Sequence, residues 1–314
     1  DEAIEAYNHV IGKYSLFKSG DGSDGYKNFS ELFTEKNEEC DEVILGVHYA
    51  GPGLNEGQTF SISWGGPMNA IEATRNLCDD YYCTDGLPID KSPLFKGKTG
   101  KEAYDKDHPD FARYENRDPR LKGTLFVPGM KWLNDVYNYD KDSNPDGKKV
   151  PSASQVAIMK WFVPENMANE YDGSLDYYVI RYAEVLLSLS EAMIEKGGYS
   201  QEQITKYINE VRERVHMPKV EDVEGTGLSQ EQLRQIVRHE RRVELAFEDL
   251  RFADLYRWGE WKDAIDRMNK EFSTYGPGDY DRSYRGAQDD VWPIPQNEID
   301  TDKNLKQHKE WGGE

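Results

Sequence analysis

The strongest constraint on the fold is the helical pattern that fills the chain from residue 176 onward. Residues 177–197 carry apolar side chains at helical spacing on two adjacent stripes, which predicts a helix that is buried over most of its surface. One stripe holds Ile180, Ala183, Leu187, Ser190 and Ile194, and the other holds Tyr182, Val185, Leu186, Leu189 and Met193. Gly197 and Gly198 supply the end of this helix. The sequence therefore predicts a fold in which helices dominate the C-terminal half.

Two further helices begin at a repeated start signal. Ser200-Gln-Glu-Gln203 and Ser229-Gln-Glu-Gln232 each match a capping box, in which the serine and the glutamine satisfy each other's backbone N–H groups. The pair 177–197 and 200–215 has the form of one tetratricopeptide-like hairpin, but no period repeats over the rest of the chain. The expected fold class is mainly α, with tetratricopeptide-like helix pairs, long irregular loops and minor β structure.

The first 175 residues contain fewer periodic segments. Residues 1–11 have helical spacing from the first residue onward, so we expect the chain to begin within a helix. A strand-like run at 42–49 leads into a glycine-rich loop at 50–67, and residues 91–175 are rich in loops. A long irregular segment within a compact domain is often a binding loop, which draws attention to residues 50–67.

The charge of the chain limits its partners. The 59 acidic and 39 basic residues give a net charge of −20, which repels nucleic acid and anionic membrane surfaces but is compatible with neutral ligands such as sugars. The 20 Tyr, 11 Phe and 7 Trp argue against disorder, and no run approaches the ~18–20 apolar residues that a membrane helix needs. Cys40, Cys78 and Cys83 have no second cysteine pair or nearby histidine for a zinc site, so we expect small buried apolar residues.

Arginines and carboxylates alternate along residues 238–258, many of them three or four positions apart. A glycoside hydrolase would need two carboxylates at a set separation, one of them with a raised pKa. Glu240, Glu244 and Glu248 have arginines close in sequence, and such pairing lowers the pKa of a carboxyl group. We therefore expect a lattice of ion pairs between helices. Arg117 and Arg120 flank Asp118-Pro119, which predicts a turn closed by charge pairing, with recognition of an acidic sugar as the alternative.

Two more motifs have structural interpretations. In WPIPQNEI the two prolines forbid a regular helix and Trp292 supplies a large apolar group, so we expect an extended segment pinned to the core. Asp142-x-Asn144-x-Asp146-Gly147 matches the first half of a calcium loop, but Ala153 stands where a glutamate is needed and Pro145 interrupts the pattern. A turn-rich loop is the preferred interpretation, and no motif indicates a cofactor, a metal or a catalytic nucleophile.

The string RHERRVELAFEDLRFADLYRW at 238–258 resembles the signature of the SusD/RagB family. Other landmarks of that family follow one another in the same order along the chain. They are DGLPI at 85–89, NRDPRL at 116–121, RYAEVLLSLSEA at 181–192, INEVRERVHMP at 208–218, WPIPQNEID at 292–300 and NLKQHKEW at 304–311. Asp249 departs from the pattern, because the family usually has glycine there.

This resemblance implies a non-enzymatic nutrient receptor. Residues 1–12 would be the remnant of a tetratricopeptide-like region, and residues 13–314 would form the C-terminal SusD/RagB domain. The resemblance further implies an outer-membrane lipoprotein on the extracellular face, whose lipid anchor lies outside this chain. Its partners would be an oligosaccharide or polysaccharide and a SusC-like TonB-dependent transporter, and no cofactor is expected.

The expected ligand contacts are aromatic residues in loops, because a pyranose ring packs its C–H face on an aromatic ring while its hydroxyls need polar partners. Two segments have this composition. The candidate residues are Tyr49, Asn55, Gln58, Trp64 and Arg75 around the first loop, and Trp132, Asn134 and Tyr137 in the second. Two alternatives remain open. A helical protein-interaction scaffold predicts that Trp64 and Trp132 are buried, and a glycoside hydrolase predicts two unpaired carboxylates across a cleft.

Overall fold

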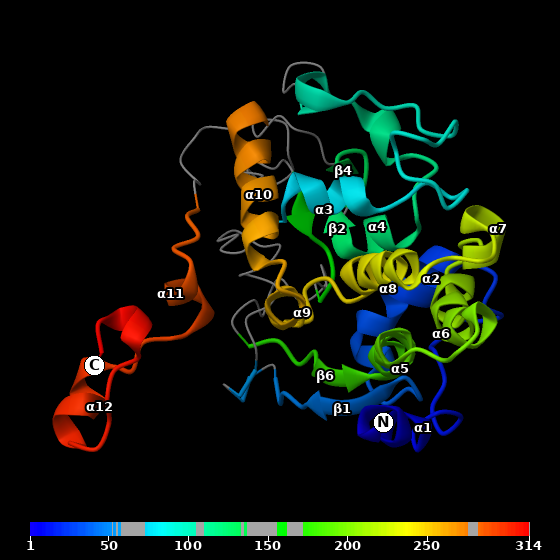
Figure 1. Cartoon of the computed structure of the whole chain (residues 1–314). Coiled ribbons are helices and arrows are strands. Elements are labelled where there is room, and N and C mark those ends of the chain that lie inside the picture. Colours follow the sequence, from blue (N-terminus) through cyan, green and yellow to red (C-terminus); the bar gives the residue numbers. More distant parts are fainter. Residues whose placement is uncertain are drawn as a thin grey trace. The chain divides into compact units, whose positions relative to one another are not determined.

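A computed structural model (Figure 1) describes residues 1–51, 53–54, 56–57, 73–104, 110–132, 135–136, 156–161, 172–275 and 282–313. At residues 101, 104, 131–132, 135–136 and 271–275 it describes the backbone alone. The contacts divide the chain into two compact units, Asp1–Arg251 and Phe252–Glu314. The predicted division between residues 1–12 and 13–314 stays a prediction.

Unit 1 is mainly helical, as predicted. Its N-terminal part contains α1 (Glu2–Asn8), α2 (Gly25–Ser30), the 3-10 helices η1 (Glu31–Phe33) and η2 (Glu35–Asn37), β1 (Val43–Val47) and α3 (Arg75–Asp80). Its middle part contains η4 (Gly100–Tyr104), η5 (Phe111–Tyr114), α4 (Arg120–Thr124), β2 (Leu125–Phe126), β3 (Lys131–Trp132), β4 (Asp135–Val136) and β5 (Ala157–Ile158). Its last part contains β6 (Tyr177–Arg181), α5 (Tyr182–Lys196), α6 (Gln201–Arg214), α7 (Val220–Glu224) and α8 (Gln230–Glu244). The strands of unit 1 form three separate two-stranded pairs, β1–β6, β2–β5 and β3–β4.

The first helix of the C-terminal half begins later than the sequence predicted. Residues Tyr177–Arg181 form strand β6, which pairs antiparallel with β1, and α5 begins only at Tyr182. The run Tyr-Tyr-Val-Ile is rich in the aromatic and β-branched residues that favour strands, and its partner β1 lies far away in the sequence. The assignment of Ile180 to a helical stripe was therefore wrong, and Ile180 lies in the strand instead.

Helices α5, α6 and α8 pack side by side and form the main apolar core (Figure 1). Leu186 and Leu189 of α5, Ile208 of α6 and Val237 of α8 are fully buried in this core. Both predicted capping boxes are present, at Ser200–Gln203 and at Ser229–Gln232. Each box satisfies two backbone N–H groups that the helix start would otherwise leave without partners, and such caps contribute about 1 kcal/mol each.

A second part of the core gathers aromatic rings. Trp161 is 1% exposed and packs edge-on against Phe33, with ring centroids 4.8 Å apart, and against Tyr178 at 5.0 Å. Its indole N–H donates to the carbonyl of Phe247 at 3.0 Å. Edge-to-face packing of this kind adds about 0.5–1.5 kcal/mol per pair to the gain from burial. Unit 1 thus keeps these large aromatic side chains inside.

Unit 2 consists of four α-helices and a short 3-10 helix in its described residues. They are α9 (Arg251–Trp258, which starts at the last residue of unit 1), α10 (Trp261–Tyr275), α11 (Ala287–Asp290), α12 (Gln296–Thr301) and η9 (Lys309–Trp311). The expectation that Trp292 anchors an extended segment to the core was wrong, because this side chain is 79% exposed. The sequence shows that Trp292 is a large apolar group, but it does not show which residues pack against it.

The cysteines and the longer helices agree with the remaining expectations. All three cysteines are free; Cys78 and Cys83 are buried, as expected, and Cys40 is half-buried. Among the described residues, no helix is both long and apolar enough to cross a membrane. The described residues also contain no cluster of three or more potential metal ligands, and the calcium-like segment Asp142–Asp146 lies outside them.

Candidate functional site

The glycine-rich loop begins directly after β1, and Asp176 fixes its first residues. The carboxylate of Asp176 accepts a hydrogen bond from the backbone N–H of Tyr49 at 3.0 Å, and its other oxygen contacts the ring of His48. The backbone N–H of Asp176 in turn donates to the carboxylate of Glu38 at 2.8 Å. Asp176 is itself buried, and its contacts position the start of the loop.

A second aspartate holds the next turn of the same loop. The carboxylate of Asp172 accepts backbone N–H groups from Gly53 at 2.5 Å and from Gly57 at 2.8 Å. A Cβ atom at Gly57 would lie 2.4 Å from the backbone of Asp172, so only glycine allows the two chains to approach this closely. Ala50 and Glu56 also form an antiparallel bridge, which closes the turn. We call residues 49–57 with 172–176 the loop base.

Few of the predicted ligand contacts lie within the described part of the chain. Tyr49 is half-buried at the loop base, and Arg75 begins α3 and is only 4% exposed. Trp132 lies in β3, where only its backbone is described. The remaining candidates, Asn55, Gln58, Trp64, Asn134 and Tyr137, lie outside the described residues. The assignment of all eight as ligand contacts stays a prediction.

A network of ten charged side chains fills the interior of unit 1, between segments that are far apart in the sequence. We call it the charge network, and every member is at least nine-tenths buried. Its five cations are Lys160, Arg120, Arg181, Arg212 and Arg214, and its five carboxylates are Glu42, Asp118, Glu240, Glu244 and Glu248. The predicted lattice of ion pairs between helices is therefore confirmed, but its cations come from distant segments and not from the arginines close in sequence to these glutamates. The predicted pairing in the RDPRL turn is confirmed as well, because Arg120 Nη2 lies 2.7 Å from Asp118 Oδ2.

Glu244 is the centre of the charge network. Its carboxylate accepts hydrogen bonds from Arg214 at 2.5 Å, from Arg181 at 2.7 Å and from Arg120 at 3.0 Å. Burial alone would raise the pKa of Glu244, but the three arginines hold this pKa well below its ordinary value. The carboxylate is thus permanently ionised at neutral pH.

The neighbouring carboxylates Glu240 and Glu248 also have lowered pKa values. Burial opposes ionisation of Glu240, yet Arg120 and Arg212 lower its pKa to about 2. Arg181 and Lys160 likewise lower the pKa of Glu248 against the effect of burial. A general acid needs a raised pKa, so these residues are unsuited to the protonation step of a glycoside hydrolase. Their role in the structure is to hold α8 against α4, α6 and β6.

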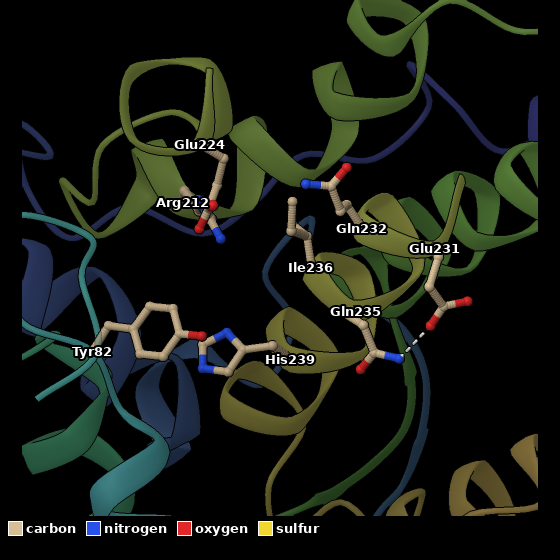
Figure 2. A pocket seen from close by; sticks show the side chains of 8 residues that line it. All are labelled: Tyr82, Arg212, Glu224, Glu231, Gln232, Gln235, Ile236 and His239. Atoms are coloured by element: carbon tan, nitrogen blue, oxygen red, sulfur yellow. Dashed lines mark hydrogen bonds between the residues drawn. The ribbon is translucent and has the colours of Figure 1, made fainter. Parts of the chain in front are cut away.

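A polar pocket lies on the outer side of α8, between Tyr82 and the segment that carries Glu224 (Figure 2). Its volume is about 250 Å³. The rings of Tyr82 and His239 stack with centroids 3.9 Å apart and an angle of 19° between their planes. His239 Nε2 donates to the carbonyl of Asp80 at 2.7 Å, since a carbonyl oxygen only accepts. Burial lowers the pKa of His239, which keeps the imidazole neutral.

The rest of this pocket is lined by amide and charged groups. Figure 2 shows Gln232, Gln235 and Glu231 on one side, with Gln235 donating to Glu231 at 2.8 Å. Arg212 forms the opposite side and is fixed by the charge network, because its Nε donates to Glu240 at 2.7 Å. The pocket thus offers hydrogen bonds to a small hydroxyl-rich molecule. The interpretation of residues 238–258 as an ion-pair segment did not include this pocket, whose signal was a polar outer face on α8.

A comparison with known families decides what kind of protein this is. The model of the SusD family matches residues 42–311, which include the loop base, the charge network and the polar pocket. The chain belongs to the SusD family. The resemblance noted in the sequence is thereby confirmed.

Individual SusD-family proteins are similar to this chain over part of their length. SusD-like protein P2 of Formosa agariphila is 32% identical over 203 residues, which cover 61% of this chain and 37% of the relative. SusD-like protein P25 of the same organism is 32% identical over 139 residues, or 44% of this chain and 25% of the relative. This chain therefore spans well under half of these two relatives.

Solved structures show the same fold. A SusD-like carbohydrate binding protein from Bacteroides fragilis superimposes with a TM-score of 0.74 at 26% identity, covering 96% of this chain and 60% of that protein. A second SusD-like protein from the same species gives a TM-score of 0.68 at 23% identity, with 97% and 60% covered. The mainly α SusD-like fold predicted from the sequence is thus confirmed.

Proposed function

We propose that this SusD-family chain is part of a cell-surface receptor that binds an oligosaccharide or polysaccharide and passes it to a SusC-like TonB-dependent transporter. The observation that carries the proposal is the family match over residues 42–311, supported by 26% identity to a structure described as a carbohydrate binding protein. Binding of this kind involves no bond chemistry. The receptor would lie on the extracellular face of the outer membrane, held by a lipid anchor outside these 314 residues.

The loop that follows β1 is the place where we expect the ligand. Asp172 and Asp176 bind the backbone N–H groups of Tyr49, Gly53 and Gly57, so the loop base supports the start of the segment in which Trp64 lies. A rigid support lowers the entropy that binding would otherwise cost. In this proposal Trp64 packs on a sugar ring, and Tyr49, Asn55, Gln58 and Arg75 supply hydrogen bonds. The second segment, with Trp132, Asn134 and Tyr137, extends the surface.

The polar pocket beside α8 is a weaker candidate for the main site. A sugar-binding platform needs an aromatic face that is open to the ligand, whereas His239 covers one face of Tyr82. Its volume of about 250 Å³ also lies below the range of about 300–1,000 Å³ that is usual for small-molecule sites. We therefore assign the platform to the loop.

Affinity electrophoresis and calorimetry with a panel of neutral and uronate-containing polysaccharides test this proposal. We expect at least one polysaccharide to bind, and Trp64→Ala to weaken binding by about tenfold or more, which corresponds to about 1.4 kcal/mol. Phe111→Ala is a matched control, because Phe111 is an exposed aromatic residue in η5 and is not one of the predicted ligand contacts. Absence of binding to the whole panel contradicts the proposal, and so does release of reducing sugars, which would indicate a hydrolase.

A positioning variant adds a readout that a merely structural role would not give. Asp172→Ala removes the acceptor for Gly53 and Gly57 but leaves every predicted ligand contact in place. We expect weaker glycan binding with a nearly unchanged melting temperature, because the two hydrogen bonds that the variant removes lie at the loop base and not in the charge network. Equal binding by the wild-type and Asp172→Ala proteins would show that the loop base does not position the ligand.

A further inference from the structure

Unit 2 contains a cavity whose walls combine aromatic and charged side chains. The cavity measures about 600 Å³, within the range of about 300–1,000 Å³ that is usual for small-molecule sites. Four aromatic side chains line it, those of Phe252, Trp261, Trp292 and Trp311. Arg285 and Asp289 line it as well. We call this cavity the aromatic pocket.

The walls of the aromatic pocket are fixed by contacts within unit 2. Trp311 donates its indole N–H to the carbonyl of Val291 at 2.8 Å, and the guanidinium of Arg285 lies 5.1 Å from the centroid of the Trp311 ring. Arg285 also donates to Asp289 at 2.8 and 2.6 Å, which sets the plane of its guanidinium. On another wall, Phe252 and Trp261 pack edge to face with centroids 5.0 Å apart.

Trp292 stands out because its side chain is almost fully open while its backbone neighbourhood is ordered. The ring is 79% exposed, the largest exposed fraction of any large apolar side chain in the described residues. Just beyond it, the side-chain amide of Gln307 pairs with both backbone groups of Ile294, at 3.0 and 2.8 Å. Pro293 and Pro295 restrict the chain further. The indole is therefore presented from a stiff segment, which lowers the entropy that a ligand would lose on packing against it.

Polar groups beside these rings indicate the chemistry of that ligand. Arg282 and Gln288 line the aromatic pocket together with Arg285 and Asp289, so hydrogen-bond donors and acceptors lie next to open aromatic surface. A purely apolar ligand would make no hydrogen bonds with these polar groups. A pyranose uses both kinds of surface at once, with its C–H face on a ring and its hydroxyls on arginine, amide and carboxylate groups.

We propose that the aromatic pocket of unit 2 is a second carbohydrate subsite, in which the indole of Trp292 packs against a pyranose ring and Arg282, Gln288 and Asp289 bind its hydroxyl groups. This inference rests on the proposed function and extends it. The subsite lies in residues 252–314 and shares no residue with the loop candidates, so it binds a separate stretch of the polysaccharide or a separate chain. Two sites on one polymer raise its overall affinity even when each site is weak.

The test uses the complete 314-residue chain and the variants Trp292→Ala and Trp64→Ala, alone and together. Leu305→Ala is the control, because Leu305 is an exposed apolar residue of unit 2 that does not line the aromatic pocket. Intrinsic tryptophan fluorescence and calorimetry are recorded with neutral gluco- and xylo-oligosaccharides and with oligogalacturonates. We expect Trp292→Ala to weaken binding about tenfold and to remove part of the fluorescence change, whereas Leu305→Ala alters neither.

The outcomes separate this inference from the proposed function. If sugars bind, and Trp64→Ala weakens their binding while Trp292→Ala binds them as the wild type does, the second subsite is refuted and the proposed function stands. If no sugar binds any variant, both are refuted. If Trp292→Ala changes only the self-association of the chain, measured by light scattering, the face is a protein contact and the inference is wrong. A further variant, Arg282→Gln, tests the class of sugar. Weaker binding of oligogalacturonates alone indicates an acidic sugar, and equally weaker binding of neutral oligosaccharides indicates a neutral one.

Discussion

The two units of this SusD-family chain place charged and aromatic side chains in opposite ways. Unit 1 buries ten charged groups in the charge network and keeps Trp161 in an apolar cluster. Unit 2 leaves Trp292 open, and in its ion pair with Asp289 the side chain of Arg285 stays 54% exposed. Burial of a charge is tolerated only with full pairing, and exposure of an indole is tolerated at a modest cost that a ligand can offset. In unit 1 the charge network holds the fold together, whereas the exposed aromatic surface of unit 2 is where we propose the second subsite.

The largest effect is expected when the charge network loses its centre. Glu244→Gln leaves five buried cations facing four carboxylates, with Arg214, Arg181 and Arg120 under-neutralised. We expect a loss of about 3–5 kcal/mol in the free energy of unfolding, measured by urea denaturation, or failure to fold. Glu231→Gln on the exposed face of the same helix should cost less than about 1 kcal/mol. A loss of less than about 1 kcal/mol for Glu244→Gln would show that the network does not hold unit 1.

Acid should weaken the same region without any mutation. The folded-state pKa of Glu240, about 2, lies below its ordinary value of 4.5, so its stabilisation is present above about pH 4.5 and is lost as the pH falls toward 2. Glu240 alone accounts for a loss of about 3 kcal/mol across that window, and Glu244 shifts in the same direction. Urea denaturation at pH 7, 4 and 3 measures this effect. Equal unfolding free energies at pH 7 and pH 3 would rule it out.

A smaller effect is expected at the end of unit 1. Asp249 has a φ angle of +62°, in the left-handed region, at the position where the family usually has glycine. Because glycine adopts this conformation without steric cost, Asp249→Gly should raise the free energy of unfolding by about 0.5 kcal/mol after the greater flexibility of the unfolded chain is subtracted. Asp249→Ala, which keeps a Cβ, should not stabilise the protein. Thermal denaturation compares the two variants.

The smallest effect on stability is expected in unit 2. Trp292→Ala should change the free energy of unfolding by less than about 0.5 kcal/mol, since the side chain makes few contacts that unfolding would remove. Trp161→Ala, the buried counterpart in unit 1, should cost about 3–5 kcal/mol. A large loss for Trp292→Ala would mean that its ring is buried in solution, and the contrast between the units would disappear.

Local signals in the sequence were sufficient for much of the fold. The capping boxes at Ser200 and Ser229 depend on residues three positions apart, and the Asp118–Arg120 pair lies within one turn, so both were predictable. Features that depend on distant partners were not. β6 looked like the start of a helix because its partner β1 lies more than 130 residues away. The exposure of Trp292 was not predictable either, because it depends on which distant residues pack against the ring.

The candidate site follows the same rule. Aromatic composition identified the loop around Trp64, but the aspartates of the loop base were missed, because Asp172 and Asp176 reach Gly53 and Tyr49 across 119 and 127 positions. The polar pocket was missed for the same reason, because its residues come from separate segments of the chain and only packing places the ring of His239 on Tyr82.

The charge network has a consequence for how the chain folds. Glu42 pairs with Arg181 across 139 positions and with Arg214 across 172, so neither of these arginine partners is local. A state in which α6 and α8 have docked but the segment around Glu42 has not would hold desolvated arginines with too few carboxylates. Such partly folded states are raised in free energy by several kcal/mol. Folding of unit 1 should therefore be strongly cooperative, and its long-range contacts should make it slow.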